Sequence, residues 1–165
     1  NCFNSNLSSL PVFNTSKGTN FESIFASCMY LTSTPAIDTS KGTNTASMFS
    51  GCNRLVTIPE YDFSNTTFIG NSFMTSASAL TTVGGFKDLG KAFLTSSAAN
   101  YYAYVVNLSP ATSLTHDSLM NVINKLYDIA TKGCNTQKLL LGSTNIAKLT
   151  SAEIAIATNK GWTVT

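Results

Sequence analysis

The chain has 165 residues, of which 11% are charged, and its formal net charge is +2. This length is sufficient for one domain with a continuous core. The small positive charge provides no basic surface of the kind that binds nucleic acid, so no nucleic-acid partner is expected. No apolar run approaches the roughly 18 residues of a membrane span, and no signal-peptide pattern is recognised.

The N-terminal part of the chain repeats itself. Residues 7–30 (LSSLPVFNTSKGTNFESIFASCMY) recur almost unchanged as residues 31–54 (LTSTPAIDTSKGTNTASMFSGCNR), a spacing of 24 residues (31 − 7). A looser third copy begins at Leu55, and a shortened fourth copy begins at Leu80. A fixed period of about 20–50 residues is typical of a solenoid, in which neighbouring units bury one another's apolar faces. The sequence therefore predicts an α/β solenoid in residues 1–100, within a single domain that comprises residues 1–165.

Equivalent positions of the copies line up in columns. The column that contains Phe25, Phe49 and Phe73 predicts a ladder of buried aromatic rings along the axis of the solenoid. The third copy has one extra residue between Phe73 and Leu80, and such an insertion is expected in a loop. The leading leucine segment of each unit predicts a short strand.

The stretch TSKGTN, which the first two units share, has the composition of a turn. Gly18 and Gly42 in this stretch are expected to adopt a positive φ. Asn20 and Asn44 are expected to cap the short helical turn that carries the phenylalanine of each unit.

After residue 100 the pattern changes to alternating strands and helices. Strands are predicted at residues 101–108, 137–141 and 162–165. The order β-α-β-α-β in residues 101–165 predicts a C-terminal cap that continues the sheet of the repeats and covers the open end of the solenoid.

Two helices are predicted within this cap. The first begins at the N-cap Thr115, carries one apolar face over residues 119–130, and is expected to stop at Lys132 and Gly133. The second begins with a capping box formed by Thr150 and Glu153 and ends near position 159.

The repeat places exposed turn residues of the same kind on neighbouring units. The residues in question are Lys17 and Lys41 in one row, and Ser16, Ser40 and Ser64 in another. Such rows could bind a protein or a glycan through several weak contacts. The alternative is that they are solvated turn residues without a ligand.

No arrangement of residues predicts catalysis. His116, Asp117 and Ser118 include the residue types of a catalytic triad, but consecutive side chains point in different directions and cannot form one. Asp38 and Asp62 occupy equivalent positions and are expected to accept hydrogen bonds from the main chain in an Asx-type turn. The glycines follow no phosphate-binding spacing, so neither an enzyme nor a cofactor is expected.

The four cysteines, at positions 2, 28, 52 and 134, are far apart in the chain and have no histidine nearby, so a metal site is not expected. Cys28 and Cys52 share a column, where stacking would bring their Cα atoms to about 5 Å, within reach of a disulfide. The alternative is two buried thiols that pack as small apolar side chains.

Residues 31–54 follow the pattern L-x-x-h-P-x-h-D-T-S-K-x-T-N-x-x-x-M-F-x-x-C-x-x, in which h is apolar, and resemble the BspA-type leucine-rich repeat. The resemblance covers residues 7–93, although the third copy has Phe63-Ser64-Asn65 in place of Thr-Ser-Lys. Residues 101–165 look like the C-terminal caps attached to such repeats. The fold class that this resemblance implies is an α/β leucine-rich-repeat solenoid with a C-terminal cap.

The resemblance implies a secreted or surface-displayed adhesion or recognition module without enzymatic activity, of the kind found in gut bacteria and their phages. Its expected partner is an extracellular protein or glycan, and its expected location is the cell surface or a virion surface. A rigid spacer or phage tail-fibre segment is the alternative function. The family shares no binding residues that could be transferred to this chain. Because the opening residues align with the tail of a preceding unit, further repeats or domains are expected on the N-terminal side.

Overall fold

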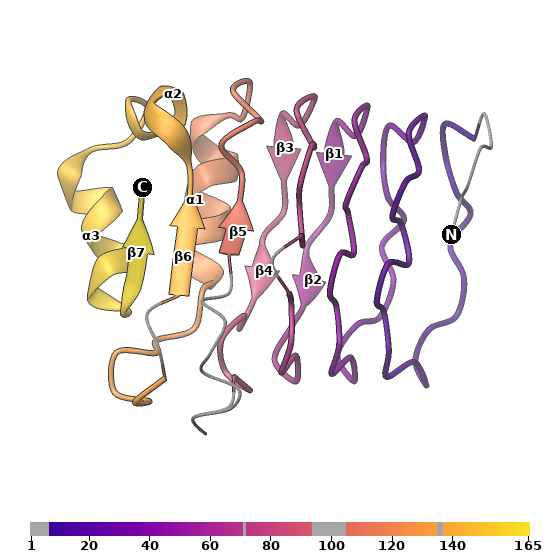
Figure 1. Cartoon of the computed structure of the whole chain (residues 1–165), viewed down its shortest axis with the longest axis horizontal. Helices are drawn as coiled ribbons and strands as arrows, with labels where there is room; N and C mark the ends of the chain where they lie inside the picture. The colour runs from indigo at the N-terminus through magenta and orange to yellow at the C-terminus, as the bar shows by residue number, and fades with distance from the viewer. Residues whose placement is uncertain (1–6, 71, 94–104, 135–136) are drawn as a thin grey trace.

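In the computed structural model, successive turns of the chain lie side by side in a single row that leads from the N-terminal part to the helices near the C-terminus (Figure 1). The structure describes residues 7–70, 72–93, 105–134 and 137–165. We number the turns of the chain as coils 1 to 4, and they begin at Leu7, Leu31, Leu55 and Leu80.

Parallel pairing between coils follows the period of the sequence. Coils 3 and 4 contain four short strands: β1 (Thr57–Ile58), β2 (Tyr61–Asp62), β3 (Thr82–Val83) and β4 (Phe86–Lys87). β1 pairs with β3 and β2 pairs with β4, between residues 25 positions apart (82 − 57), because of the extra residue before Leu80. Coils 1 and 2 are joined by a bridge between Asn20 and Asn44, which are 24 positions apart (44 − 20).

Threonine side chains add hydrogen bonds between the coils. Thr43 donates to the carbonyl of Thr19 with both its amide, at 2.8 Å, and its hydroxyl, at 3.2 Å. Thr67 donates in the same way to the carbonyl of Thr43, at 2.9 Å and 3.0 Å. The repeated threonine therefore provides two donors for one carbonyl oxygen of the preceding coil.

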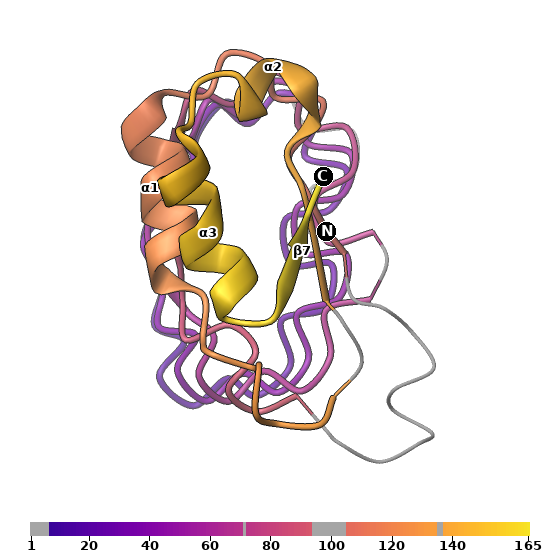
Figure 2. The same ribbon diagram turned by 90° about the vertical axis from the view of Figure 1, so that its left-hand side faces the viewer.

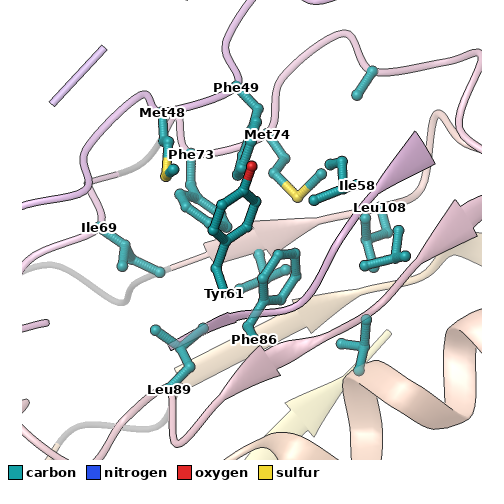
Figure 3. Packing of buried hydrophobic residues seen from close by; sticks show 14 of the residues in the cluster. Met48, Phe49, Ile58, Tyr61, Ile69, Phe73, Met74, Phe86, Leu89 and Leu108 are labelled. Carbon is teal, nitrogen blue, oxygen red and sulfur yellow. The ribbon is translucent and has the colours of Figure 1, made fainter. Parts of the chain in front are cut away.

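The predicted phenylalanine ladder is confirmed. Phe25, Phe49 and Phe73 are fully buried, and the centroids of successive rings are 5.8 Å and 5.5 Å apart. Figure 3 shows Phe49 and Phe73 beside Tyr61, whose hydroxyl donates to the carbonyl of Pro35 at 2.7 Å. Burial raises the pKa of Tyr61 far above its ordinary value. The rings form a continuous core that joins one coil to the next.

The helical turn expected after Asn20 and Asn44 does not form. Both asparagines accept a hydrogen bond from the amide two positions on, at 2.9 Å and 3.0 Å, as a capping residue does. However, Ser23 and Ser47 each adopt a φ of 55°, which a right-handed helix does not contain. The amide of Ser23 donates instead to the carbonyl of Ala46 in the next coil, at 2.9 Å. Pairing between coils therefore takes alternate amides of this segment, while the amides of Ile24 and Ala26 donate to carbonyls three positions earlier.

Gly18 and Gly42 have a different role from the one predicted, because neither adopts a positive φ. A Cβ at Gly42 would lie 2.7 Å from the ring of Phe21, and a Cβ at Gly18 would lie 2.8 Å from the same ring. The ring thus occupies the space next to two turns that lack side chains at these positions. One unit further along the chain, Thr45 replaces Phe21 and Thr66 replaces Gly42.

The described residues of the C-terminal cap form three strands and three helices: β5 (Val105–Asn107), α1 (His116–Lys125), β6 (Gln137–Leu140), α2 (Gly142–Ile146), α3 (Ser151–Asn159) and β7 (Trp162–Val164). The order of the predicted elements is confirmed, and the capping box of Thr150 and Glu153 is present. Residues 101–104 of the first predicted strand lie outside the described residues, and α2 is an addition to the predicted elements. None of the helices in the described part of the chain is long and apolar enough to span a bilayer.

The predicted end of α1 is wrong. The N-cap Thr115 makes the expected hydrogen bond, but the helix ends at Lys125 rather than at Lys132. Leu126 is extended and forms a parallel bridge with Leu89 of coil 4. This contact with the repeats interrupts a local pattern that would otherwise continue the helix.

α1 covers the edge of coil 4, at the end of the repeats that the helices of the cap were predicted to cover. The amide of Val83 donates to Ser118 Oγ at 3.1 Å, and Asn121 Nδ2 donates to the carbonyl of Val83 at 3.3 Å. Helix side chains therefore take the hydrogen-bonding positions of a neighbouring strand. β5, β6 and β7 form a separate parallel sheet. In Figure 2, which looks along the row of coils, α1 and α3 lie on one side of the outline of the coils and β7 lies on the other. Among the described residues, none of the cap strands pairs with a strand of the repeats.

Candidate functional site

The predicted serine row is built into the turns of the coils. Ser40 donates to Asp38 Oδ1 with its amide, at 3.0 Å, and with its hydroxyl, at 2.6 Å. Ser16 makes the same pair of hydrogen bonds to the side chain two positions earlier, and the amide of Ser64 donates to Asp62 at 2.9 Å. The predicted Asx-type turns at Asp38 and Asp62 are confirmed. The hydroxyls of Ser16 and Ser40 hold these turns in shape, so they are less suited to donate to a ligand.

The aspartates of these turns are ionised at neutral pH. Hydrogen bonds from the hydroxyl and the amide of Ser40 hold the pKa of Asp38 below its ordinary value. Burial acts to raise the pKa of Asp62, but hydrogen bonds from Lys87 and Ser64 outweigh burial and lower it. Lys87 Nζ lies 2.7 Å from Asp62 Oδ2. Neither carboxyl group is therefore suited to act as a general acid.

Lys17 and Lys41 are the predicted site residues that are available to a ligand. Both are exposed on neighbouring coils, and neither ammonium donates a hydrogen bond within the described residues. Three lysines of the cap differ from them, since Lys125, Lys148 and Lys160 each donate to main-chain carbonyls of another segment. Of the two predicted rows, the structure therefore leaves the lysine row open.

A cavity of about 420 Å³ opens beside Lys17. It is lined by residues 14–18 together with Asn20, Phe21 and Ile24, all from coil 1. These residues provide polar turn groups and two apolar side chains, and they include no carboxylate, histidine or cysteine. The lining is suited to hold an apolar group beside hydrogen-bonding partners rather than to perform acid–base chemistry. The sequence repeat alone did not indicate this cavity.

His116 joins two helices of the cap. Its Nε2 lies 2.9 Å from Glu153 Oε1 at the start of α3, and its Nδ1 lies 3.6 Å from Asp117 Oδ1. The hydrogen bond to Glu153 raises the pKa of His116, while hydrogen bonds from Thr150 lower the pKa of Glu153. Sequence reasoning missed this pair because its members are 37 positions apart. The sequence predicted for Glu153 only a role in the capping box at the start of α3.

The described residues contain no group of three or more histidine, cysteine, aspartate or glutamate side chains that could hold a metal ion. Cys28 and Cys52 are both buried in the core. Cys52 Sγ donates to the carbonyl of Phe25 at 3.0 Å, so this side chain acts as a thiol donor between coils. Cys2 lies outside the described residues.

Comparison with known proteins identifies no relative of this chain. No family model matches it, and no curated protein or solved structure is significantly similar to it. The resemblance of residues 31–54 to the BspA-type leucine-rich repeat is therefore a prediction that rests on the sequence pattern alone.

Proposed function

We propose that this protein is a non-enzymatic recognition module of the extracellular or cell surface that binds a protein or a glycan through the side of its stacked coils. The observation that carries the proposal is the exposure of Lys17 and Lys41 on neighbouring coils. The bridge between Asn20 and Asn44 keeps these coils in register, so the two ammonium groups belong to one row. A row of this kind suits a ligand with repeated acidic groups, because each weak contact raises the effective concentration for the next.

The architecture that we propose for this module is a BspA-type leucine-rich-repeat solenoid with a C-terminal cap. Its support is the column of leading leucines, since Leu31, Leu55 and Leu80 are at most 1% exposed. The 24-residue spacing of the parallel bridge from Asn20 to Asn44 is the second support. Further repeats or domains on the N-terminal side belong to the same proposal.

The test is binding of the chain to arrayed acidic glycans and to immobilised matrix proteins, with two charge-reversal variants. Lys41→Glu is expected to weaken binding at least tenfold. Lys138→Glu is the matched control, because Lys138 is exposed on β6 in the cap and its reversal changes the net charge by the same amount. Equal loss of binding in both variants, or no binding by the unmodified chain, would contradict the proposed lysine row.

A rigid spacer or tail-fibre segment is the second candidate function. The observation that favours it is the continuous contact of aromatic rings, with Phe73 5.5 Å from Phe49 and 5.4 Å from Phe86. Such a core couples the coils mechanically and resists bending between them. A spacer predicts that neither lysine variant changes any binding. It also predicts one cooperative unfolding transition when a single chain is extended by force.

A further inference from the structure

A second exposed surface lies at the end of the coils opposite the lysine row. Lys17 and Lys41 correspond to Asn65 of coil 3, which follows β2, whereas residues 54–56 directly precede β1. Figure 1 shows β1 nearer to one end of coil 3 and β2 nearer to the other. The surface around residues 54–56 and the lysine row are therefore separated by the strand segment of the coil.

The side chains next to the buried leading leucine of coil 3 point outward. Leu55 is 0% exposed, whereas Arg54 is exposed and Val56 is 37% exposed. The equivalent residues one coil earlier, Tyr30 and Thr32, are also exposed. The guanidinium of Arg54 lies over the ring of Tyr30, and the amide of Val56 donates to the coil 2 carbonyl at position 32, at 2.8 Å. The four exposed residues therefore form one surface, which we call the arginine patch: Tyr30, Thr32, Arg54 and Val56.

The arginine patch belongs to the side of the row rather than to its end. The carbonyl of Val56 accepts from the amide of Thr81 in coil 4, at 3.0 Å, so Val56 has a paired coil on each side. The repeat itself does not require this patch. The position of Val56 holds Thr32 in coil 2 and Thr81 in coil 4, and the position of Arg54 holds Ala79 at the end of coil 3. An exposed valine and an arginine are thus particular to this part of the row.

Arg54 supplies a cation without a counter-ion among the described residues. It is the single arginine of the chain, and its Cζ lies 5.1 Å from the centroid of the Tyr30 ring. The ion pairs of the described residues all involve lysine or histidine. Contact with the ring holds the plane of the guanidinium, while the N–H donors on its edge can still bind a planar acceptor. The group is therefore placed to form two parallel hydrogen bonds with a carboxylate.

The rest of the patch favours a polypeptide as the partner. Val56 is apolar, Tyr30 is 38% exposed, and the neighbouring Met29 is 42% exposed. Arginine, tyrosine and methionine are enriched where proteins bind one another. An acidic residue would neutralise the charge of Arg54, and an apolar residue beside it would cover Val56.

We propose that the arginine patch binds an extended segment of a partner protein in which an aspartate or glutamate and an apolar residue are two positions apart. The carboxylate pairs with the guanidinium of Arg54, and the apolar side chain packs on Val56. Side chains two positions apart lie on one face of an extended segment, about 6.8 Å from each other. This spacing suits Arg54 and Val56, which are themselves two positions apart in the chain. The patch and the lysine row are separate sites, and either binds without the other.

The experiment is a titration of the isotope-labelled full chain with a synthetic peptide in which the unit glutamate-threonine-valine-threonine recurs. Because Arg54 is the single arginine, its Nε–H group gives one nuclear magnetic resonance signal that reports directly on the guanidinium. The glutamate peptide is expected to shift this signal and the amides of residues 54–57 in a saturable way. The same peptide with glutamine in place of glutamate is expected to bind at least about tenfold more weakly, because it lacks the charge.

Variants of the chain identify the side chains that hold the peptide. Arg54→Glu is expected to weaken binding of the glutamate peptide at least about tenfold, measured from the amide signals. Lys138→Glu is the matched control, since Lys138 is exposed in the cap and its reversal changes the net charge by the same amount. Val56→Thr copies the residue of the flanking coils and is expected to weaken binding about threefold. The amide spectrum of each variant also shows whether the chain remains folded.

Several results would overturn the proposed partner. They are an Arg54 signal that does not shift, equal binding of the two peptides, and a loss of binding in Lys138→Glu as large as in Arg54→Glu. A sulfated oligosaccharide that shifts the Arg54 signal when the peptide does not would assign the patch to a glycan instead. A dimer in sedimentation velocity runs that Arg54→Glu abolishes would assign it to a second copy of the chain. Lys41→Glu is expected to leave peptide binding unchanged, and a loss there would place the peptide on the lysine row.

Discussion

Replacement of Gly42 by alanine tests why the first two units have glycine where the third has threonine. The added Cβ would lie 2.7 Å from the ring of Phe21, closer than side-chain carbons approach in folded proteins. The main chain itself accepts a side chain here, since Gly42 has no positive φ. Thr66, at the equivalent position of coil 3, makes the corresponding turn hydrogen bond to the carbonyl of Phe63 at 3.0 Å. Contact with Phe21 is therefore the expected cause of any loss of stability.

The expected changes in the free energy of unfolding differ enough between the variants to be told apart. Overpacking by one methyl group costs about 1–3 kcal/mol, which is the expected effect of Gly42→Ala in the unmodified chain. Phe21→Thr, which copies Thr45 of coil 2, removes a buried ring and costs about 3–5 kcal/mol by itself. In the Phe21→Thr background the conflict with the ring is absent and only the 3.0 Å approach to the carbonyl of Thr39 remains. Gly42→Ala is then expected to stabilise the chain by about 0.4–1 kcal/mol through the unfolded state. The effect of the alanine thus changes sign.

Urea unfolding followed by far-ultraviolet circular dichroism measures the four free energies of this cycle. Gly133→Ala is the control, because a Cβ at Gly133 would have no heavy atom within 4 Å and its effect should not depend on Phe21. If the effects of Gly42→Ala and Phe21→Thr add to within about 0.5 kcal/mol, the steric explanation is refuted.

Three further changes test the core and the cap. Phe49→Ala is expected to cost about 3–5 kcal/mol in urea unfolding, because this buried ring contacts three others. Lys160→Met removes two hydrogen bonds to carbonyls at the end of α1 and is expected to cost about 1 kcal/mol, seen as a lower melting temperature, whereas Lys160→Arg retains donors. The raised pKa of His116 means that its pair with Glu153 stabilises the fold fully below the ordinary value of 6.5. This contribution is lost as the pH rises through the raised pKa. A difference in stability between the unmodified chain and His116→Gln that stays constant with pH would contradict this reasoning.

The sequence predicted those features of the fold that depend on period and on local hydrogen bonding. The 24-residue spacing led to the correct register between Asn20 and Asn44 and to the buried ladder of Phe25 and Phe49. The N-cap Thr115 and the capping box at Thr150 were recognised because each involves residues only three positions apart.

The candidate site was predicted only in part. The pattern identified Lys17 and Lys41 as equivalent turn residues, and both are exposed. It also proposed the serines as ligand-binding groups, but the hydroxyls of Ser16 and Ser40 are engaged by side chains two positions earlier. The cavity in coil 1 depends on where this coil lies in the row. Units with nearly the same sequence do not reveal their positions in the row.

The repeat, the columns that become the core and the order of strands and helices in the cap all follow from the amino-acid sequence. Three features depend on contacts between distant segments: the positive φ of Ser23, the end of α1 at Lys125 and the pairing of His116 with Glu153. The role of Gly42 depends on such a contact as well, because this glycine leaves space for the ring of Phe21 and is not needed for a positive φ in the turn. The physical reason is the same in each case. A donor, a charge or a space within one unit is taken by a residue some 20 to 40 positions away, and a local pattern contains no information about that neighbour.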